Sequence, residues 1–390
     1  MKVIVIGAGI VGASIAYALA RDGAEVTLIE RGSPGGGASH ASYAWVNSNS
    51  FDEPRYHALR VLSMAAYREL ADELGGGTDA WLHETGSLRV AFTDEQADQV
   101  AQRVTAKRAA AYPAEVIDDP ATIPALRNLP RQPKIAARYP TESYVDTTVF
   151  IGALLHRFAG YGGTLLRTAV TALGPAGVTT DSAATDSAGT GDGHLDADRV
   201  VVATGADTSL LKDAGFPLEA LGPAGATVIT DPLPVPLNGL IHFPDLTVRP
   251  DGGGRLLLHA LDIDAKIETA SPRGSLALDK ESVDELTERA SGYLGVQATA
   301  ADVRLSFRPH PPDGFPVVGP VPGRGSAPGE HGSAPGKHGP APGKQGAYVV
   351  CTHSGVTLAA ILARLVSREI RTGTPDPLLA PYRPGRIQTP

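Results

Sequence analysis

Residues 3–30 constrain the fold of this chain most, because they carry a complete strand–turn–helix–strand pattern that ends in an acid. Gly7, Gly9 and Gly12 stand in GxGxxG spacing between a short apolar run and an alanine-rich segment. In such a turn the first glycine makes the bend, the second lets a pyrophosphate approach the backbone, and the third lets helix and strand pack closely. Glu30 ends the second strand, where a carboxylate accepts hydrogen bonds from a ribose. The pattern therefore predicts a bound dinucleotide.

The same segment also imitates a secretory signal. Lys2 precedes a mostly apolar run, and Ala18-Leu19-Ala20 resembles a cleavage site. Cleavage there would remove all three glycines and leave the second strand without its neighbour. The glycines also interrupt the apolar run, and no stop-transfer pattern follows it. We therefore interpret the segment as part of a folded nucleotide-binding unit.

Composition argues against several other classes of protein. The chain has 390 residues, with 42 acids against 34 Lys and Arg, and a net charge of −8. This balance argues against a nucleic-acid surface and against a polybasic membrane anchor. The single cysteine, Cys351, excludes a disulfide framework and a thiolate zinc site. We expect a cytoplasmic protein with no metal site, no nucleic-acid partner and no insertion into a membrane.

The remainder of the chain mixes helical and strand-like patterns. Helices are predicted over residues 54–75, 94–111, 144–163, 278–294 and 355–371. Strands are predicted over residues 164–172, 199–203, 226–229, 246–248, 255–259, 303–307 and 347–350. Residues 81–92 read as a hairpin, and the Pro-rich segment 113–140 reads as irregular. Asp94 is the expected cap of the second helix.

One low-complexity segment lies near the end of the chain. Residues 326–346 contain three copies of a seven-residue unit, SAPGEHG, SAPGKHG and PAPGKQG. With almost no apolar side chains this unit cannot build a core, so we expect a disordered surface insert over residues 324–346. Its two histidines, His331 and His338, make a poor metal site on such a tract.

Three further stretches accompany the glycine fingerprint. GGGASHASYAWVN spans residues 35–47, DRVVVATGA spans 198–206, and FRPHPPDGFPVVGP leads from residue 307 through the insert into AYVVCTHSGVTL. Together these motifs resemble the D-amino-acid oxidase, glycine oxidase and sarcosine oxidase family of FAD enzymes, and most of all its bacterial D-amino-acid-dehydrogenase-like members. The resemblance covers nearly the whole chain outside the insert and residues 174–194.

The resemblance implies an α/β fold with two domains. A Rossmann-like FAD-binding domain, built from discontinuous segments, would occupy residues 1–80, 140–215 and 305–390. An antiparallel β-rich substrate-binding domain would occupy residues 81–139 and 216–304.

The resemblance also implies which residues bind the cofactor. Glu30 would bind the adenosine ribose, Ser39 would lie at the pyrophosphate, and the backbone of Val170 would contact adenine. The amides that open the last helix would point at the flavin edge where negative charge accumulates on reduction. The expected FAD-binding residues are Gly7, Gly9, Gly12, Glu30, Arg31, Ser39, His40, Val170, Ala203, Thr204, Gly205, Ser354, Gly355, Val356 and Thr357.

We expect this FAD to be noncovalent. Related dimethylglycine-dehydrogenase-like enzymes carry a flavin-linked histidine near the position of His40, but the residues around it do not otherwise match. Sarcosine-oxidase-like members use a cysteine before the PDG turn, where Ser306 and its neighbours offer no thiol. Cys351 reads as a buried strand residue.

The catalytic residues implied by the resemblance are Arg308 and His353. Arg308 matches the arginine that binds the substrate carboxylate in glycine-oxidase-like members, and a guanidinium fork suits that group. A structural ion pair is the alternative role for Arg308. His353 replaces a second arginine of some members; it would contact the flavin or the substrate, or cap the last helix.

These features predict an FAD-dependent oxidoreductase that oxidises a carboxylate-bearing amine or amino acid. Hydride would pass to flavin N5, an imine would form, and O2 or another acceptor would take the electrons. An FAD monooxygenase acting on an aromatic or indolic carboxylate is the alternative, although VVCTHSG replaces the GD motif expected before its last helix. A non-catalytic flavin-binding module is a third. The substrate, the electron acceptor and the oligomeric state stay open.

Overall fold

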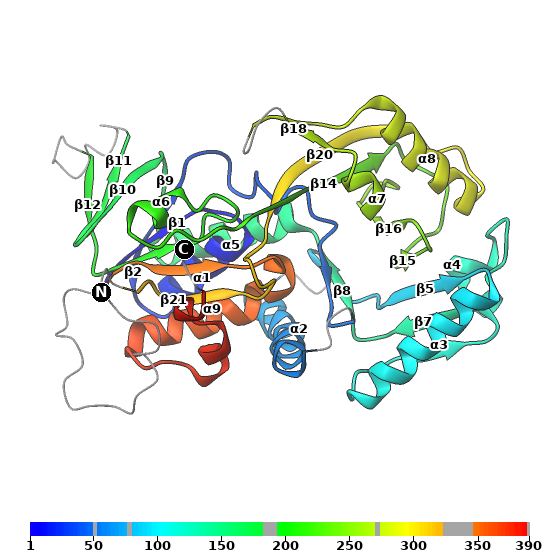
Figure 1. The fold of residues 1–390 in the computed structure, drawn as a ribbon, viewed down its shortest axis with the longest axis horizontal. Coiled ribbons are helices and arrows are strands. Elements are labelled where there is room, and N and C mark those ends of the chain that lie inside the picture. Colours follow the sequence, from blue (N-terminus) through cyan, green and yellow to red (C-terminus); the bar gives the residue numbers. More distant parts are fainter. Residues whose placement is uncertain (50–52, 76–79, 182–192, 270–273, 323–345, 388–390) are drawn as a thin grey trace. The chain divides into compact units, whose positions relative to one another are not determined.

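The computed structural model describes residues 1–49, 53–75, 80–181, 193–269, 274–322 and 346–387 (Figure 1). The chain divides into two compact units. Unit 1 comprises Met1–Ser39, Thr147–Gly222 and Arg308–Pro390, and unit 2 comprises His40–Asp146 and Pro223–Phe307. Parallel and antiparallel sheets together with helices confirm the predicted α/β class.

Unit 1 is built on a six-stranded sheet in the order β21-β22-β13-β1-β2-β9. Every neighbouring pair runs parallel except β21 and β22. The bounds are β1 Lys2–Ile6, β2 Glu25–Glu30, β9 Thr164–Arg167, β13 Arg199–Val202, β21 Val317–Pro320 and β22 Tyr348–Cys351. The inner strands are short and almost wholly buried, as expected for a parallel sheet covered on both faces. A small antiparallel sheet adds β10 Val170–Gly174, β11 Gly177–Thr180 and β12 His194–Asp196.

Helix α1 (Ile10–Arg21) packs against α5 (Thr147–Gly160) and α9 (Gly355–Thr372). Both α1 and α9 follow directly on parallel strands, β1 and β22, so they begin at the same edge of the sheet. Gly373 ends α9 in the left-handed conformation, with φ +68° and its N–H bonded to the carbonyl of Glu369. The smaller helical segments of unit 1 are α6 Ser209–Asp213, η4 Pro377–Tyr382 and η5 Pro384–Arg386.

Unit 2 contains most of an eight-stranded sheet in the order β20-β14-β17-β16-β15-β5-β7-β6. The bounds are β20 Ala300–Pro309, β14 Leu221–Thr230, β17 Leu256–His259, β16 Thr247–Pro250, β15 Leu240–His242, β5 Ser87–Ala91, β7 Ile135–Tyr139 and β6 Glu115–Ile117. One face of this sheet is apolar and forms a core with α8 (Lys280–Leu294). The other helices of the unit are α2 Pro54–Leu74, α3 Asp94–Ala109, η1 Pro120–Thr122, α4 Pro124–Arg127 and α7 Leu261–Asp264. A three-stranded sheet consists of β3 Trp45–Val46, β8 Ser143–Val145 and β4 Leu82–His83, and a two-stranded sheet consists of β18 Glu268–Thr269 and β19 Leu276–Ala277.

Three local predictions are wrong, all in unit 2. Residues 81–92 form no hairpin, because β4 pairs with β8 while β5 pairs with β7 and β15. The segment predicted to be irregular contains β7, which pairs along the whole of β5. Thr93 rather than Asp94 caps α3, through a reciprocal capping box with Gln96. In unit 1, the single strand predicted over residues 164–172 is divided into β9 and β10. The predicted insert, apart from Gly346, lies outside the described residues.

Candidate functional site

The GxGxxG turn lies between β1 and α1, at the carboxyl end of the parallel sheet. Gly7 has φ +97°, and a Cβ on it would lie 2.6 Å from the carbonyl oxygen of Ala203. A Cβ on Gly12 would lie 1.8 Å from the carbonyl oxygen of Gly7. A Cβ on Gly9 would only meet Ser39 Oγ, at 3.4 Å. Two of the three glycines are therefore required by packing, whereas Gly9 leaves a space that a pyrophosphate can approach.

Glu30 and Ser39 are held against this turn by backbone amides. The N–H of Ala8 donates to Glu30 Oε2 at 2.8 Å, and the N–H of Gly32 donates to Oε1 at 2.7 Å. The N–H of Ile10 donates to Ser39 Oγ at 3.0 Å. The acid and the hydroxyl thus lie beside the first turn of α1, whose partial positive charge favours a phosphate. This cradle fits the adenosine diphosphate portion of FAD.

The other residues predicted to contact the nucleotide, apart from His40, lie around the same edge of unit 1. Ala203 donates its N–H to the carbonyl of Ile6 at 2.9 Å, which brings the Ala-Thr-Gly turn beside Gly7. Arg31 Nη1 forms an ion pair with Asp207 at 2.7 Å and is exposed. Val170 begins β10, two residues after Thr168, whose N–H donates to the carbonyl of Glu30. His40 is exposed and is the first residue of unit 2.

Helix α9 begins next to α1. A Cβ on Gly355 would lie 3.3 Å from Val11 Cγ2 and 3.9 Å from Ile10 Cγ2, so the first turns of the two helices are in contact. The expected flavin-contacting backbone, Ser354–Thr357, is this first turn together with the residue before it. Two helix N-termini therefore converge at one edge of the sheet and provide amides for the anionic parts of a flavin dinucleotide.

Arg308 lies near the end of β20, two residues before His310. The ring of His310 meets the ring of His353 edge-on, with centroids 5.3 Å apart. Gly222 packs closely against this turn, since a Cβ there would lie 2.6 Å from the carbonyl oxygen of Arg308. The two residues predicted to act on the substrate are thus linked through His310. Sequence analysis did not single out His310, although it stands inside the FRPHPPDG motif.

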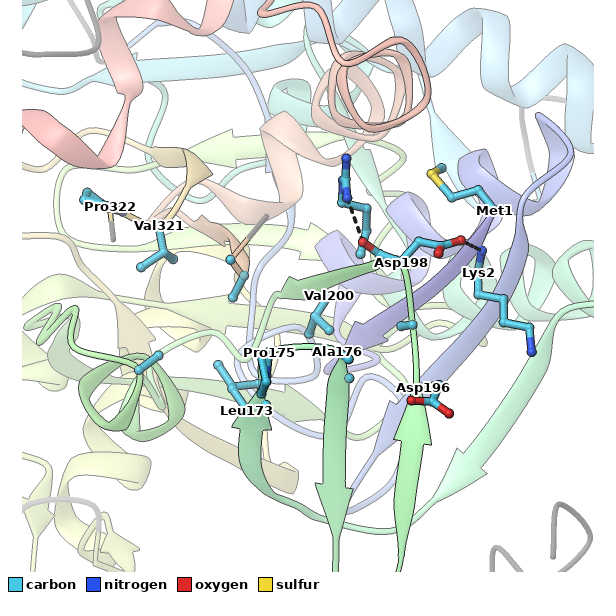
Figure 2. Close-up of a pocket in the computed structure, with 17 residues that line it drawn as sticks. Met1, Lys2, Leu173, Pro175, Ala176, Asp196, Asp198, Val200, Val321 and Pro322 are labelled. Atoms are coloured by element: carbon cyan, nitrogen blue, oxygen red, sulfur yellow. Dashed lines mark hydrogen bonds between the residues drawn. The ribbon is translucent and has the colours of Figure 1, made fainter. Parts of the chain in front are cut away.

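A pocket of about 690 Å³ lies elsewhere in unit 1 (Figure 2). Its lining includes Met1, Lys2, Asp198 and Ala347, which precede or begin strands β1, β13 and β22. In Figure 2 the backbone N–H of Lys2 donates to Asp198 Oδ2, at 2.7 Å. This is the amino end of the parallel sheet, whereas ligands of such sheets bind at the carboxyl end. We therefore do not place the cofactor there.

Unit 2 contains a buried carboxyl group that sequence analysis missed. The side chain of Glu142 is fully buried, and burial raises its pKa to about 7. Trp45 Nε1 and the Ser87 hydroxyl donate to Oε2, and the Tyr112 hydroxyl donates to Oε1 at 2.8 Å. Tyr112 also accepts the N–H of Ser48 at 3.1 Å. Three neutral donors thus satisfy Glu142.

Comparison with known proteins decides the family. Residues 2–369 match the family model described as FAD dependent oxidoreductase. The chain belongs to this family. The oxidoreductase is 27% identical to glycine oxidase from Geobacillus kaustophilus, over 83% of this chain and 85% of that protein. It is 26% identical to a D-amino acid dehydrogenase from Rhizobium johnstonii, over 82% of this chain and 88% of that protein.

A solved structure agrees with these relatives. The crystal structure of glycine oxidase from Geobacillus kaustophilus superposes with a TM-score of 0.80 and 25% identity, covering 100% of both chains. The predicted family, the FAD cofactor and the amino-acid oxidase or dehydrogenase type of enzyme are thereby confirmed. The comparisons give no support to the monooxygenase alternative.

The described residues contain neither a membrane-spanning helix nor a metal-binding cluster. None of their helices combines the length and the apolar composition needed to cross a bilayer. No cluster of three or more His, Cys, Asp or Glu side chains is arranged there to hold a metal ion. His331 and His338 lie outside the described residues.

We expect acid precipitation of the yellow holoenzyme to leave the flavin in the supernatant. Cys351 is buried, which raises the pKa of its thiol to about 12, and the thiol donates to the carbonyl of Gly205. A thiol attacks as the thiolate, so Cys351 is unsuited to forming a tether. Ser306 offers no thiol. Colour retained in the pellet of the wild type but lost from that of His40→Ala would instead establish a histidyl link.

The raised pKa of Glu142 predicts an unusual pH dependence of stability. Between pH 4.5 and about 7 the folded protein holds this proton while the unfolded chain releases it, so stability falls as pH rises through that window. Glu142→Gln mimics the protonated form and removes the effect. Its free energy of unfolding relative to wild type should therefore rise between pH 5 and pH 8, by at most about 3 kcal/mol. Parallel pH profiles in urea unfolding would contradict this prediction.

Proposed function

We propose that this oxidoreductase oxidises a carboxylate-bearing amine or amino acid to an imine. The observation that carries the proposal is the position of Arg308 in unit 1. Arg308 stands two residues before His310, the ring of His310 contacts that of His353, and His353 stands two residues before α9, whose first turn packs on α1. These positions support a role for Arg308, whose guanidinium suits a carboxylate, near the FAD cradle of unit 1.

Each residue then has a role that its position supports. Glu30 accepts the ribose hydroxyls, and the first turns of α1 and α9 receive the anionic groups of FAD. Arg308 binds the substrate carboxylate with two parallel charge-assisted hydrogen bonds and so fixes the orientation of the neighbouring carbon. FAD, when bound, would supply the acceptor for the hydride, which carries the electron pair away from the C–N carbon. Little general-base assistance is required if the amine arrives neutral.

The names of the relatives support an amino-acid substrate. The Geobacillus protein is a glycine oxidase and the Rhizobium protein is a D-amino acid dehydrogenase. We propose O2 or another electron acceptor for the second half of the reaction, and unit 2 as the principal substrate-binding domain.

Anaerobic mixing of the holoenzyme with a panel of amines tests the proposal. Amines that carry a carboxylate should bleach the flavin absorbance, and the same amines with the carboxylate converted to an amide should bleach it much more slowly. Equal rates for acids and amides would remove the carboxylate from the proposal. Bleaching by no amine, together with hydroxylation of an aryl acid, would replace the proposal with the monooxygenase.

A further inference from the structure

The eight-stranded sheet has a polar face opposite its core. Val90, Ile241 and Val248 belong to the apolar core, and side chains alternate between the faces of a strand. Their neighbours Arg89 and His242 therefore lie on the opposite face, where the two residues pair in register across β5 and β15 (Figure 1). Thr247 is the next residue in the same row, opposite His242.

Arg89 forms no ion pair among the described residues. It is half-buried, and its Nε is a buried donor with no hydrogen-bond partner among the described residues. Glu142 lies close enough to act on Arg89 through its charge, but the oxygens of Glu142 accept the three neutral donors described above. A buried N–H donor without a partner is costly, so this guanidinium favours an anionic ligand that accepts from Nε.

A second arginine increases the local positive charge. Arg103 of α3 is half-buried, and its Nη1 lies 3.5 Å from Asn49 Oδ1. It lies close enough to Arg89 to lower the pKa of that guanidinium, after the larger effect of burial. Within the described ranges neither arginine forms an ion pair. Two positive charges therefore gather over this part of the sheet.

His242 adds a neutral hydrogen-bonding group to the same place. It is only 4% exposed, its Nδ1 lies 3.1 Å from Thr247 Oγ1, and its Nε2 has no partner among the described residues. Burial, followed by the charges of Arg89, His259 and Arg103, holds the pKa of His242 well below its usual value. When the Thr247 hydroxyl donates to Nδ1, the proton of the neutral ring is on Nε2, where it can be donated to a ligand.

We propose that Arg89, Arg103 and His242, which all belong to unit 2, form a binding site for a carboxylate. Guanidinium groups bind a carboxylate through paired donors, and an Nε2–H beside them adds a third. The expected ligand is a small organic carboxylate.

Calorimetric titration of the holoenzyme tests the site without turnover. The probe is glutarate, and its diamide, glutaramide, removes both charges at nearly constant size. Arg89→Met should weaken glutarate binding roughly 10- to 100-fold, the loss expected for hydrogen bonds to a charged group, and should leave glutaramide binding nearly unchanged. Arg138→Met is the matched control, because Arg138 is exposed on the neighbouring strand opposite Leu88 and carries the same charge. It should bind both ligands as wild type does.

Unchanged glutarate binding by Arg89→Met, or an equal loss of glutarate binding by Arg138→Met, would overturn the proposal. Because the titration needs no turnover, its outcome is independent of the proposed function. Arg89-dependent glutarate binding by an enzyme that oxidises no amine would refute the proposed function but would leave the carboxylate site standing.

Discussion

Replacing Gly12 with alanine is expected to abolish FAD binding and to destabilise unit 1. The added Cβ would lie 1.8 Å from the carbonyl oxygen of Gly7, which is backbone and cannot rotate away. Helix α1 would have to move off the sheet, at a cost of roughly 3 kcal/mol or more, as in severe overpacking of a core. The purified variant should be colourless, with a lower thermal midpoint than wild-type apoprotein.

Gly9→Val separates cofactor binding from folding. Since the nearest atom to a Cβ on Gly9 is Ser39 Oγ, at 3.4 Å, the variant should fold with a thermal midpoint close to that of wild-type apoprotein. It should nevertheless lose FAD, because the side chain occupies the path of the pyrophosphate. A yellow Gly9→Val enzyme would contradict this assignment of the glycine turn.

Arg308→Ala is expected to lower kcat/KM roughly 30- to 1000-fold, because a desolvated bidentate pair is worth about 2–4 kcal/mol. Arg308→Lys should recover only part of the loss, since an ammonium group cannot reproduce the planar fork. The flavin content of both variants should equal that of wild type. This measurement distinguishes loss of substrate binding from loss of cofactor.

An amide analogue of the substrate provides the control for Arg308. Wild type should react much more slowly with the amide than with the acid, whereas Arg308→Ala should distinguish the two only weakly. If the variant discriminates as well as wild type does, another residue binds the carboxylate. His353 is then the first to test, because its ring adjoins His310.

Local patterns sufficed to predict the nucleotide turn and the last helix. The GxGxxG spacing and the apolar stripe of residues 355–371 can each be recognised within one segment, although their strands and helices pack against distant parts of the chain, as β1 does with β13 and α1 with α9. The misread hairpin over residues 81–92 shows the limit. Its two strands, β4 and β5, pair with β8 and with β7 and β15, respectively. The alternation of apolar and polar residues within a strand does not indicate which distant strand it will pair with.

The same limit applies to the candidate sites. Arg308 was recognised through a motif, but the contact of His310 with His353 depends on how β20 and α9 come together. Glu142 lies in the short segment TESYVD, where an acid reads as an ordinary turn residue. Only its surroundings in the folded chain show that it is buried, and this burial raises its pKa, against the opposite effect of the hydrogen bonds from Trp45, Ser87 and Tyr112.

The strand order of unit 1 has a consequence for synthesis on the ribosome. β22 pairs with β13 on one side and with β21 on the other. Both β21 and β22 lie beyond residue 316. Until they emerge, the nascent sheet of β13, β1, β2 and β9 exposes the hydrogen-bonding edge of β13. An uncovered edge of this kind invites pairing with other chains. Helix α9 follows these strands in the chain, so the nascent chain cannot complete its flavin cradle until Gly355 and the residues after it have been synthesised.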